Sequence, residues 1–132
     1  MARALKGLDA SFLYLESAEV PMHVGGLHLI ERPKALRKPF VDAVRAHVAK
    51  RIHLAPVLEQ RLKLLPLDIG HPVWERVVDV DLNQQITSLK LPAGSGYLAL
   101  NKLVAKLHGE LLPRDRPLWQ FYVIEGLKSG EV

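Results

Sequence analysis

The chain has 132 residues, of which 48% are hydrophobic and 24% are charged, and its net charge is +4. This length suits one modest domain with a single core, and the mild, scattered positive charge does not favour nucleic-acid binding. Because cysteine is absent, the chain has no disulfides or thiolate metal sites, and no apolar run approaches the ~20 residues that span a bilayer.

The first predicted element is a short helix over Leu8–Glu16, with Asp9 as its N-cap. The apolar residues Leu8, Phe12 and Leu15 recur at helical spacing and would share one face.

A strand is predicted over Met22–Ile30, after the break at Pro21. Its paired glycines, Gly25 and Gly26, indicate a bulge or the close approach of another backbone or of a ligand. The two-residue period of a strand would place Met22, Val24, Gly26 and His28 on one face and His23, Gly25, Leu27 and Leu29 on the other.

The middle of the chain alternates between helix and strand. Pro39 is expected in the first turn of a helix that extends to about Ile52, and Pro56 would open one further helical turn. Strands are predicted over Arg61–Leu65 and Val73–Val78, with a loop at residues 68–72 between them. The apolar face of the predicted helix consists of Phe40, Val41, Val44, Val48 and Ile52.

A weak strand is predicted over Gln85–Leu91, followed by a loop over Pro92–Gly96. Tyr97–Leu111 has the strongest helical pattern in the chain, which Gly109 would weaken by ~1 kcal/mol relative to alanine and Pro113 would end. The apolar stripe of this helix consists of Leu100, Leu103, Val104, Leu107 and Leu111.

The stretch Arg116–Leu127 begins with a proline, continues with aromatic and β-branched residues and closes on Gly126. This pattern predicts a buried strand that enters a tight turn at Lys128–Gly130. Only two residues follow the turn, so we expect a strand whose hairpin partner is missing and whose edge is unpaired. The alternation of helices and strands along the whole chain indicates an α/β or α+β fold.

Motif chemistry alone leaves the function open. His23 and His28 would face opposite sides of a strand, and no other pair among the six histidines has a local spacing suited to a metal, so no metal site is predicted. Gly94-Ser95-Gly96 could cradle a phosphate, but it lacks the Lys-Ser/Thr of a P-loop, which favours a flexible lead-in to the next helix. The serines lie in no nucleophile-elbow context.

Six stretches, in this order, carry a family resemblance: Leu8–Glu16, Pro21–Gly26, His53–Leu62, Pro72–Trp74, Arg114–Trp119 and Ile124–Leu127. Together they resemble the bacterial wax ester synthase/diacylglycerol acyltransferase family over essentially the whole chain. The resemblance implies a fold like that of the CoA-dependent acyltransferases (chloramphenicol acetyltransferase-like, a two-layer α/β sandwich). Residues 1–132 would be its N-terminal part and incomplete alone.

The resemblance also implies an activity. Members of the family transfer the acyl group of acyl-CoA to diacylglycerol or a long-chain alcohol, so acyl-CoA would be a co-substrate and no other cofactor is implied. Their His-His-x-x-x-Asp-Gly motif supplies a general base, and in family members it follows shortly after the Glu-Gly-Leu strand. This sequence has no adjacent pair of histidines, so the resemblance assigns no catalytic residue here.

We therefore expect the catalytic motif and a C-terminal domain to lie outside these 132 residues, in a companion chain or in the remainder of a longer protein. A third possibility is that the chain is a truncated gene product. Among residues that match family motifs, Pro117, Leu118 and Trp119 would support the structure around the active-site channel. Met22, His23, Gly25 and Gly26 would line the substrate channel. The alternative for these four is a bulged core strand with His23 as a hydrogen-bonded structural residue.

Two other functions remain open from the sequence. One is a non-catalytic module that binds acyl chains or lipid surfaces, and the other is the condensation domain of peptide synthetases, against which Asp9–Glu16 and Pro117–Trp119 argue. Met1–Lys6 lacks the apolar segment of a signal peptide, so a cytoplasmic location with at most peripheral contact to membranes or lipid inclusions is expected.

Overall fold

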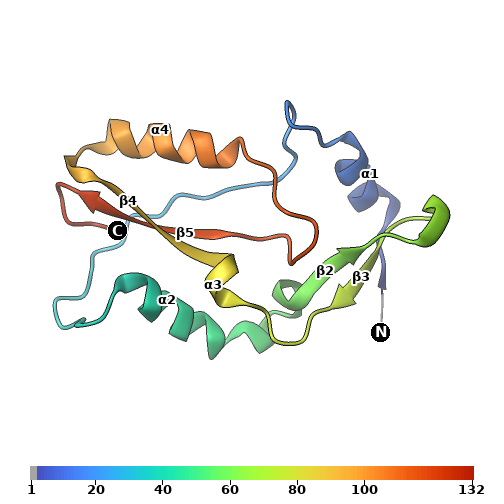
Figure 1. Ribbon diagram of the computed structural model, residues 1–132, viewed down its shortest axis with the longest axis horizontal. Helices are drawn as coiled ribbons and strands as arrows, with labels where there is room; N and C mark the ends of the chain where they lie inside the picture. The colour runs from blue at the N-terminus through green and yellow to red at the C-terminus, as the bar shows by residue number, and fades with distance from the viewer. Residues whose placement is uncertain (1–2) are drawn as a thin grey trace.

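Two small β-sheets organise the chain in the computed structural model, which describes residues 3–132 (Figure 1). The first sheet is antiparallel, with strand order β1-β3-β2, and the second consists of the parallel pair β4 and β5. The strands are β1 (Arg3–Ala4), β2 (Gln60–Lys63), β3 (Val73–Arg76), β4 (Ile86–Ser95) and β5 (Phe121–Leu127). The expectation for Met1–Lys6 falls in part on residues 1–2, outside the described residues.

Within residues 3–132, four α-helices and three short 3-10 turns accompany the sheets. The helices are α1 (Gly7–Leu15), α2 (Phe40–Ala49), α3 (Leu82–Gln85) and α4 (Tyr97–His108). The 3-10 turns are Ile52–Leu54, Pro56–Glu59 and Pro66–Asp68. None of the described helices is long and apolar enough to cross a membrane.

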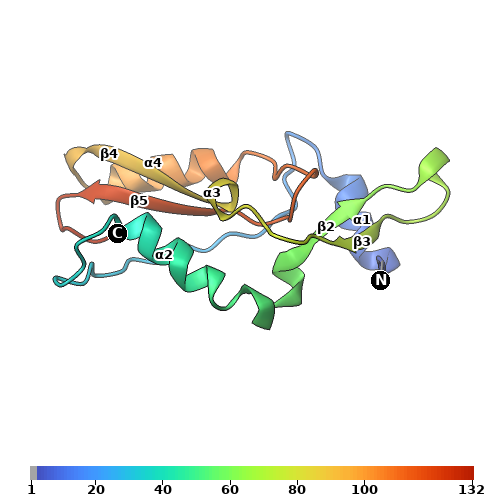
Figure 2. The ribbon, with the colours of Figure 1, turned by 60° about the horizontal axis from the view of Figure 1, so that its bottom comes forward.

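Helices cover both faces of the parallel pair β4–β5. On β5, Val123 packs with Val41 of α2, whereas its neighbour Ile124 packs with Leu100 of α4. Successive residues of a strand point to opposite faces, which places α2 and α4 on opposite sides of the sheet, as Figure 2 shows. The predicted mixed α/β class is therefore confirmed.

A third cluster lies at the other end of the molecule, where Leu5, Ala10 and Leu62 are buried and Leu13, Trp74 and Leu118 pack against them. It joins α1 to the antiparallel sheet. The helix predicted at Leu8–Glu16 is confirmed within one residue, but Lys6 and not Asp9 occupies the N-cap position; Asp9 lies in the first turn, where its charge suits the helix dipole.

The apolar face predicted on this helix points outward. Leu8, Phe12 and Leu15 are 71%, 46% and 66% exposed. The helix instead turns Ala10 and Leu13 to the cluster, because the antiparallel sheet lies on that side.

Met22–Ile30 is extended in the structure, but it is not part of a β-ladder. The predicted strand is therefore wrong for the described residues. The physical reason is that no strand of residues 3–132 pairs with it. Within these residues, Ile30 is the one position of the segment that forms backbone–backbone hydrogen bonds, and its partner is Val132. The predicted loop over Pro92–Gly96 is also wrong, because β4 continues to Ser95. Its register against β5 shifts between Lys90 and Ser95, and such an irregularity accommodates a proline in a strand.

The remaining predictions differ mainly at element ends. Pro39 precedes α2 as its N-cap residue, and the turn at Pro56 is confirmed. The strand expected to reach Leu65 ends at Lys63, and α4 ends at His108, so Gly109 is its C-cap residue. The helix stripe packs as predicted through Leu100, Leu103, Val104 and Leu107, whereas Leu111 lies beyond α4.

The strand and turn predicted at the end of the chain are confirmed as β5 and a turn closed by the Gly130 N–H and the Leu127 carbonyl. The expectation of a missing partner is corrected in part, since β5 pairs in parallel with β4 through the α4 crossover. Beyond the turn, Glu131 forms an antiparallel bridge with Glu31.

Candidate functional site

The predicted channel segment is anchored to the end of α4 by His23. Its Nε2 lies 2.9 Å from the carbonyl oxygen of His108, and the two imidazole rings meet edge to face at 4.9 Å between centroids. A carbonyl oxygen can only accept, so Nε2 carries the proton and donates it. The two histidines are 85 positions apart in the sequence, and only the fold brings them together.

Glu16, directly after α1, anchors the same segment from its other side. Its carboxylate accepts a hydrogen bond from the Met22 N–H at 3.1 Å and another from Arg114 at 3.1 Å. Burial by itself would raise the pKa of Glu16, but these two donors and the nearby positive charge outweigh it and hold the pKa below its ordinary value. Glu16 is therefore held as a carboxylate between a backbone donor and a guanidinium.

The second nitrogen of His23 is enclosed. Nδ1 is buried, lies 4.0 Å from Glu16 Oε2 and has no hydrogen-bond partner within residues 3–132. Since Nε2 donates to a backbone carbonyl and Nδ1 is closed off, neither nitrogen can take a proton from an incoming hydroxyl group in this arrangement. This geometry fits the interpretation of His23 as a hydrogen-bonded structural residue.

Gly25 lies close to a side chain, and not to the backbone or ligand that the paired glycines predicted. A Cβ at this position would lie 3.0 Å from His108 Nδ1, whereas one at Gly26 would meet only the His28 ring, at 3.4 Å. The neighbour of Gly25 is thus the end of α4. Met22 is half-buried beside Glu16, and Val24 is 95% exposed.

The Pro117-Leu118-Trp119 motif lies between the core clusters. Pro117 is buried, Leu118 packs against the cluster of α1, and Trp119 packs against the cluster of α2. The Trp119 indole N–H donates to the Leu58 carbonyl at 2.9 Å. The partly buried indole therefore packs against the core cluster of α2.

A residue that sequence reasoning missed, Gln85, holds this motif. Its side-chain Nε2 donates to the carbonyl oxygens of Pro117 at 3.0 Å and Trp119 at 2.6 Å, and the residue is only 1% exposed. Both amide hydrogens are thereby used on one turn of the backbone. No motif or spacing marks Gln85 in the sequence, because the two carbonyls lie more than 30 positions away.

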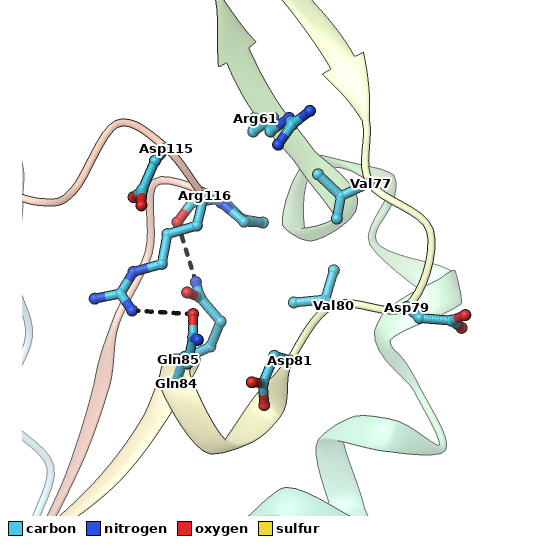
Figure 3. A pocket seen from close by; sticks show the side chains of 10 residues that line it. Arg61, Val77, Asp79, Val80, Asp81, Gln84, Gln85, Asp115 and Arg116 are labelled. Atoms are coloured by element: carbon cyan, nitrogen blue, oxygen red, sulfur yellow. Dashed lines mark hydrogen bonds between the residues drawn. The ribbon is translucent and has the colours of Figure 1, made fainter.

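A small cavity of about 180 Å³ opens beside this turn (Figure 3). Gln84, Gln85, Arg116 and Pro117 are among the residues that line it, and Arg116 donates to the Gln84 side-chain oxygen at 3.3 Å. Ligand pockets usually measure about 300–1,000 Å³, so this recess by itself is too small for a long acyl chain.

The two predicted sets of site residues are linked by Arg114, which donates to the Leu13 carbonyl and to Glu16 and lies three positions before Pro117. Within residues 3–132 the side chains form no group of three or more His, Cys, Asp or Glu that could hold a metal ion. At the glycine loop considered for phosphate, the Ser95 hydroxyl donates to the Pro92 carbonyl at 2.6 Å.

Comparisons with known proteins give these features a context. The family described as the wax ester synthase/diacylglycerol acyltransferase catalytic domain matches residues 5–132. A Mycobacterium tuberculosis protein named as a candidate diacylglycerol O-acyltransferase is 35% identical over 130 residues, which cover 98% of this chain and 28% of that protein. Another candidate of that species, tgs3, is 32% identical over 132 residues, covering 100% of this chain and 48% of that protein.

The solved wax ester synthase/diacylglycerol acyltransferase from Marinobacter aquaeolei has the same fold over 97% of this chain and 32% of its own, with a TM-score of 0.79 and 31% identity. This chain thus spans between 28% and 48% of the length of these relatives, and it matches the N-terminal part of an acyltransferase-like fold. The chain belongs to the wax ester synthase/diacylglycerol acyltransferase family.

Proposed function

We propose that residues 1–132 are the N-terminal part of an acyl-CoA-dependent O-acyltransferase that makes triacylglycerol, wax esters or both. The observation that carries this proposal is the family match over residues 5–132, supported by the TM-score of 0.79 to the Marinobacter enzyme. The catalytic histidine motif and a C-terminal domain would come from polypeptide outside these residues.

In the reaction, a general base of that motif removes the proton of the acceptor hydroxyl. The hydroxyl oxygen forms a bond to the thioester carbonyl carbon, the carbon–sulfur bond breaks, and the CoA thiol leaves with the proton. Met22, His23, Gly25 and Gly26 would form part of the channel wall. Pro117, Leu118 and Trp119 would support that wall from behind, because Arg114 ties their loop to Glu16.

A chimera tests the assignment. Residues 1–132 would replace the matching part of the Marinobacter enzyme, and purified protein would be assayed with palmitoyl-CoA and either hexadecanol or dioleoylglycerol. We expect ester formation by the chimera and none by residues 1–132 alone.

A chimera whose host histidine motif is changed to alanine is the matched control and should be inactive. Activity of residues 1–132 alone would contradict the placement of the base outside this chain. A folded but inactive chimera, with the parent enzyme active in parallel, would count against the family function.

Lipid-surface contact is a second candidate, favoured by exposed apolar side chains at one end of the molecule. The helix α1 and the tip between β2 and β3 lie at the same end of the molecule (Figure 1). At this tip, Leu64 and Ile69 are exposed and Leu67 is 89% exposed. Such side chains suit an interfacial contact. Flotation with anionic liposomes at low salt should carry the chain upward, and a chain that stays at the bottom would exclude this function.

A further inference from the structure

The loop Pro33–Pro39, the basic loop, lies between Met22–Ile30 and α2 and concentrates positive charge. Lys34, Arg37 and Lys38 fall within a stretch of five residues, and all three are exposed. Elsewhere in the described chain, five arginines and one lysine have an acidic partner. Within residues 3–132, no acid forms an ion pair with any of the three cations of the basic loop. They therefore present unneutralised charge to solvent.

The basic loop is held in one shape by its own residues and by Arg32. A proline at each end fixes the local φ angle. The Leu36 N–H donates to the Pro33 carbonyl at 3.0 Å, which closes a turn. The Arg32 guanidinium donates to the Lys38 carbonyl at 3.1 Å and to Glu125 of β5 at 2.8 Å, so it ties the base of the loop to the sheet. A ligand would meet a loop that is already ordered, which lowers the entropic cost of binding.

The acids that flank the basic loop do not cancel its charge. Residues 31–42 contain four lysines or arginines and two acids, Glu31 and Asp42. Asp42 is paired with Arg45 of the same helix at 3.4 Å. Glu31 is then the one acid of this stretch without an ion pair to residues 3–132. The stretch keeps a net positive charge.

The chemistry of the basic loop fits phosphate groups. A guanidinium offers phosphate oxygens a planar pair of donors, and an ammonium adds a compact point charge. The loop has no aromatic side chain on which a base could stack, which disfavours single-stranded nucleic acid. It also has no exposed apolar anchor for a protein interface, because Leu36, its one large apolar residue, is half-buried.

The basic loop lies at the end of the molecule opposite the tip between β2 and β3, as Figures 1 and 2 both show. The exposed side chains of Leu64 and Leu67 belong to that tip. Contact of the tip with a lipid surface would therefore not by itself bring the basic loop to phosphate groups. The two surfaces can be changed separately.

We propose that the basic loop is a phosphate-binding surface, on which Lys34, Arg37 and Lys38 contact phosphate groups of acyl-CoA or of anionic lipid headgroups. This inference rests on the proposed function, in which the acyl donor carries phosphates and the acceptor is a lipid. The chemistry shared by the two sources is a phosphate ester. Electrostatic attraction of this kind raises the local concentration of the ligand and weakens as salt is added.

Binding by the complete 132-residue chain is measured at low salt with two probes. One probe is CoA, followed by titration calorimetry, and the other is vesicles of phosphatidylcholine and phosphatidylglycerol, followed by cosedimentation. The loop variant combines Lys34→Gln, Arg37→Gln and Lys38→Gln. We expect it to bind at least one probe about 100-fold more weakly than the parent chain, since each cation near an anionic surface contributes about fivefold.

A matched control removes the same charge elsewhere and combines Lys50→Gln, Lys102→Gln and Lys106→Gln. These lysines lie at the end of α2 and on α4, are exposed and have no ion pair to the described residues. The control should bind both probes within about twofold of the parent chain. The conservative variant with Lys34→Arg and Lys38→Arg should also keep the parent affinity, which separates loss of charge from loss of fold.

The two probes distinguish the sources of phosphate. Weakening confined to CoA would identify the co-substrate, weakening confined to vesicles would identify lipid headgroups, and weakening with both would assign both to the basic loop. Equal weakening by the loop variant and the control would overturn the inference, because net charge would then explain binding. No binding of either probe by the parent chain would overturn it too. Tighter binding of a polyglutamate peptide than of both probes would assign the loop to an acidic protein instead.

These measurements are independent of turnover. Loop-dependent binding together with an inactive chimera would contradict the proposed function alone. An active chimera without loop-dependent binding would contradict the phosphate-binding surface alone.

Discussion

Two segments of this chain, Met22–Ile30 and β5, have a similar composition but different structures. Each has a proline at or shortly before its start, is rich in apolar residues and contains glycine, so the same reasoning predicts a strand in each. β5 pairs with β4 at five consecutive positions from Phe121 to Glu125 and buries Val123 and Ile124. Met22–Ile30 has no ladder, and Val24 is almost fully exposed.

The difference lies in the availability of a partner. The α4 crossover brings β4 beside β5. The side chains of β5 therefore pack on both faces of the sheet, and its backbone pairs with β4 along one edge. For Met22–Ile30, residues 3–132 supply one covering helix end and two end contacts but no neighbouring strand. Strand propensity therefore becomes a strand only where another backbone is in reach.

The largest change in stability is expected at Gly126, in β5. A Cβ there would clash with the Leu91 carbonyl oxygen, and φ is +109°, so Gly126→Ala combines a backbone clash with left-handed strain. We expect a loss of about 3 kcal/mol in the free energy of unfolding, measured with urea.

Gly94→Ala is the matched control, because Gly94 also has a positive φ of 80° but no atom within 4 Å of the Cβ position. Gly94→Ala should lower the free energy of unfolding by about 1 kcal/mol. If both variants lose the same stability, the close approach of β4 and β5 at Gly126 does not distinguish β5 from the other segment.

The second-largest change in stability is expected at Gln85, which holds the backbone turn just before β5. Gln85→Leu removes the donor shared by the Pro117 and Trp119 carbonyls and also removes the unpartnered Oε1, which offsets part of the loss. We expect about 2 kcal/mol of destabilisation, read from urea unfolding. The adjacent and exposed Gln84→Leu should change stability by less than about 0.5 kcal/mol, and a larger change there would contradict the assignment of the anchor to Gln85.

The pH dependence of stability tests whether Glu16 anchors the segment Met22–Ile30. The pKa of Glu16 is lowered in the folded state, so its contribution to stability is complete above the ordinary value of 4.5 and is lost as the pH falls through the folded value. Between about pH 5 and pH 3, the parent chain should lose about 1 kcal/mol more than Glu16→Gln.

Glu19→Gln, at an exposed carboxyl nearby, serves as the control and should follow the pH dependence of the parent chain. A Glu16→Gln profile identical to that of the parent would show that Glu16 does not anchor Met22.

The smallest effect is expected at Gly25. Gly25→Ala brings a methyl group within 3.0 Å of His108 Nδ1, but that imidazole is exposed and can shift, so the loss should stay below about 1 kcal/mol. The specific readout is the NMR shift of the His23 and His108 rings. Gly26→Ala should leave both rings unchanged, and a disturbance by Gly26→Ala alone would reverse the assignment of the close approach.

Much of this protein was readable from its sequence. Helical spacing located α2 and α4, the run of β-branched and aromatic residues located β5, and the order of the motifs indicated the family. These features depend on local periodicity or on short stretches of identity, which a linear reading captures. Three predictions were wrong: the loop at Pro92, where β4 continues past a proline, the buried apolar face of α1, and the strand over Met22–Ile30.

Only the tertiary structure decided the contacts between distant positions: His23 against the end of α4, Glu16 with Arg114, and Gln85 beneath the Pro-Leu-Trp turn. It also decided that β4 is parallel to β5 and that Met22–Ile30 has no neighbour within residues 3–132. The physical reason is that a side chain's propensity acts on its own backbone, whereas hydrogen bonds and sheet partners depend on which segments the packing of the core brings together.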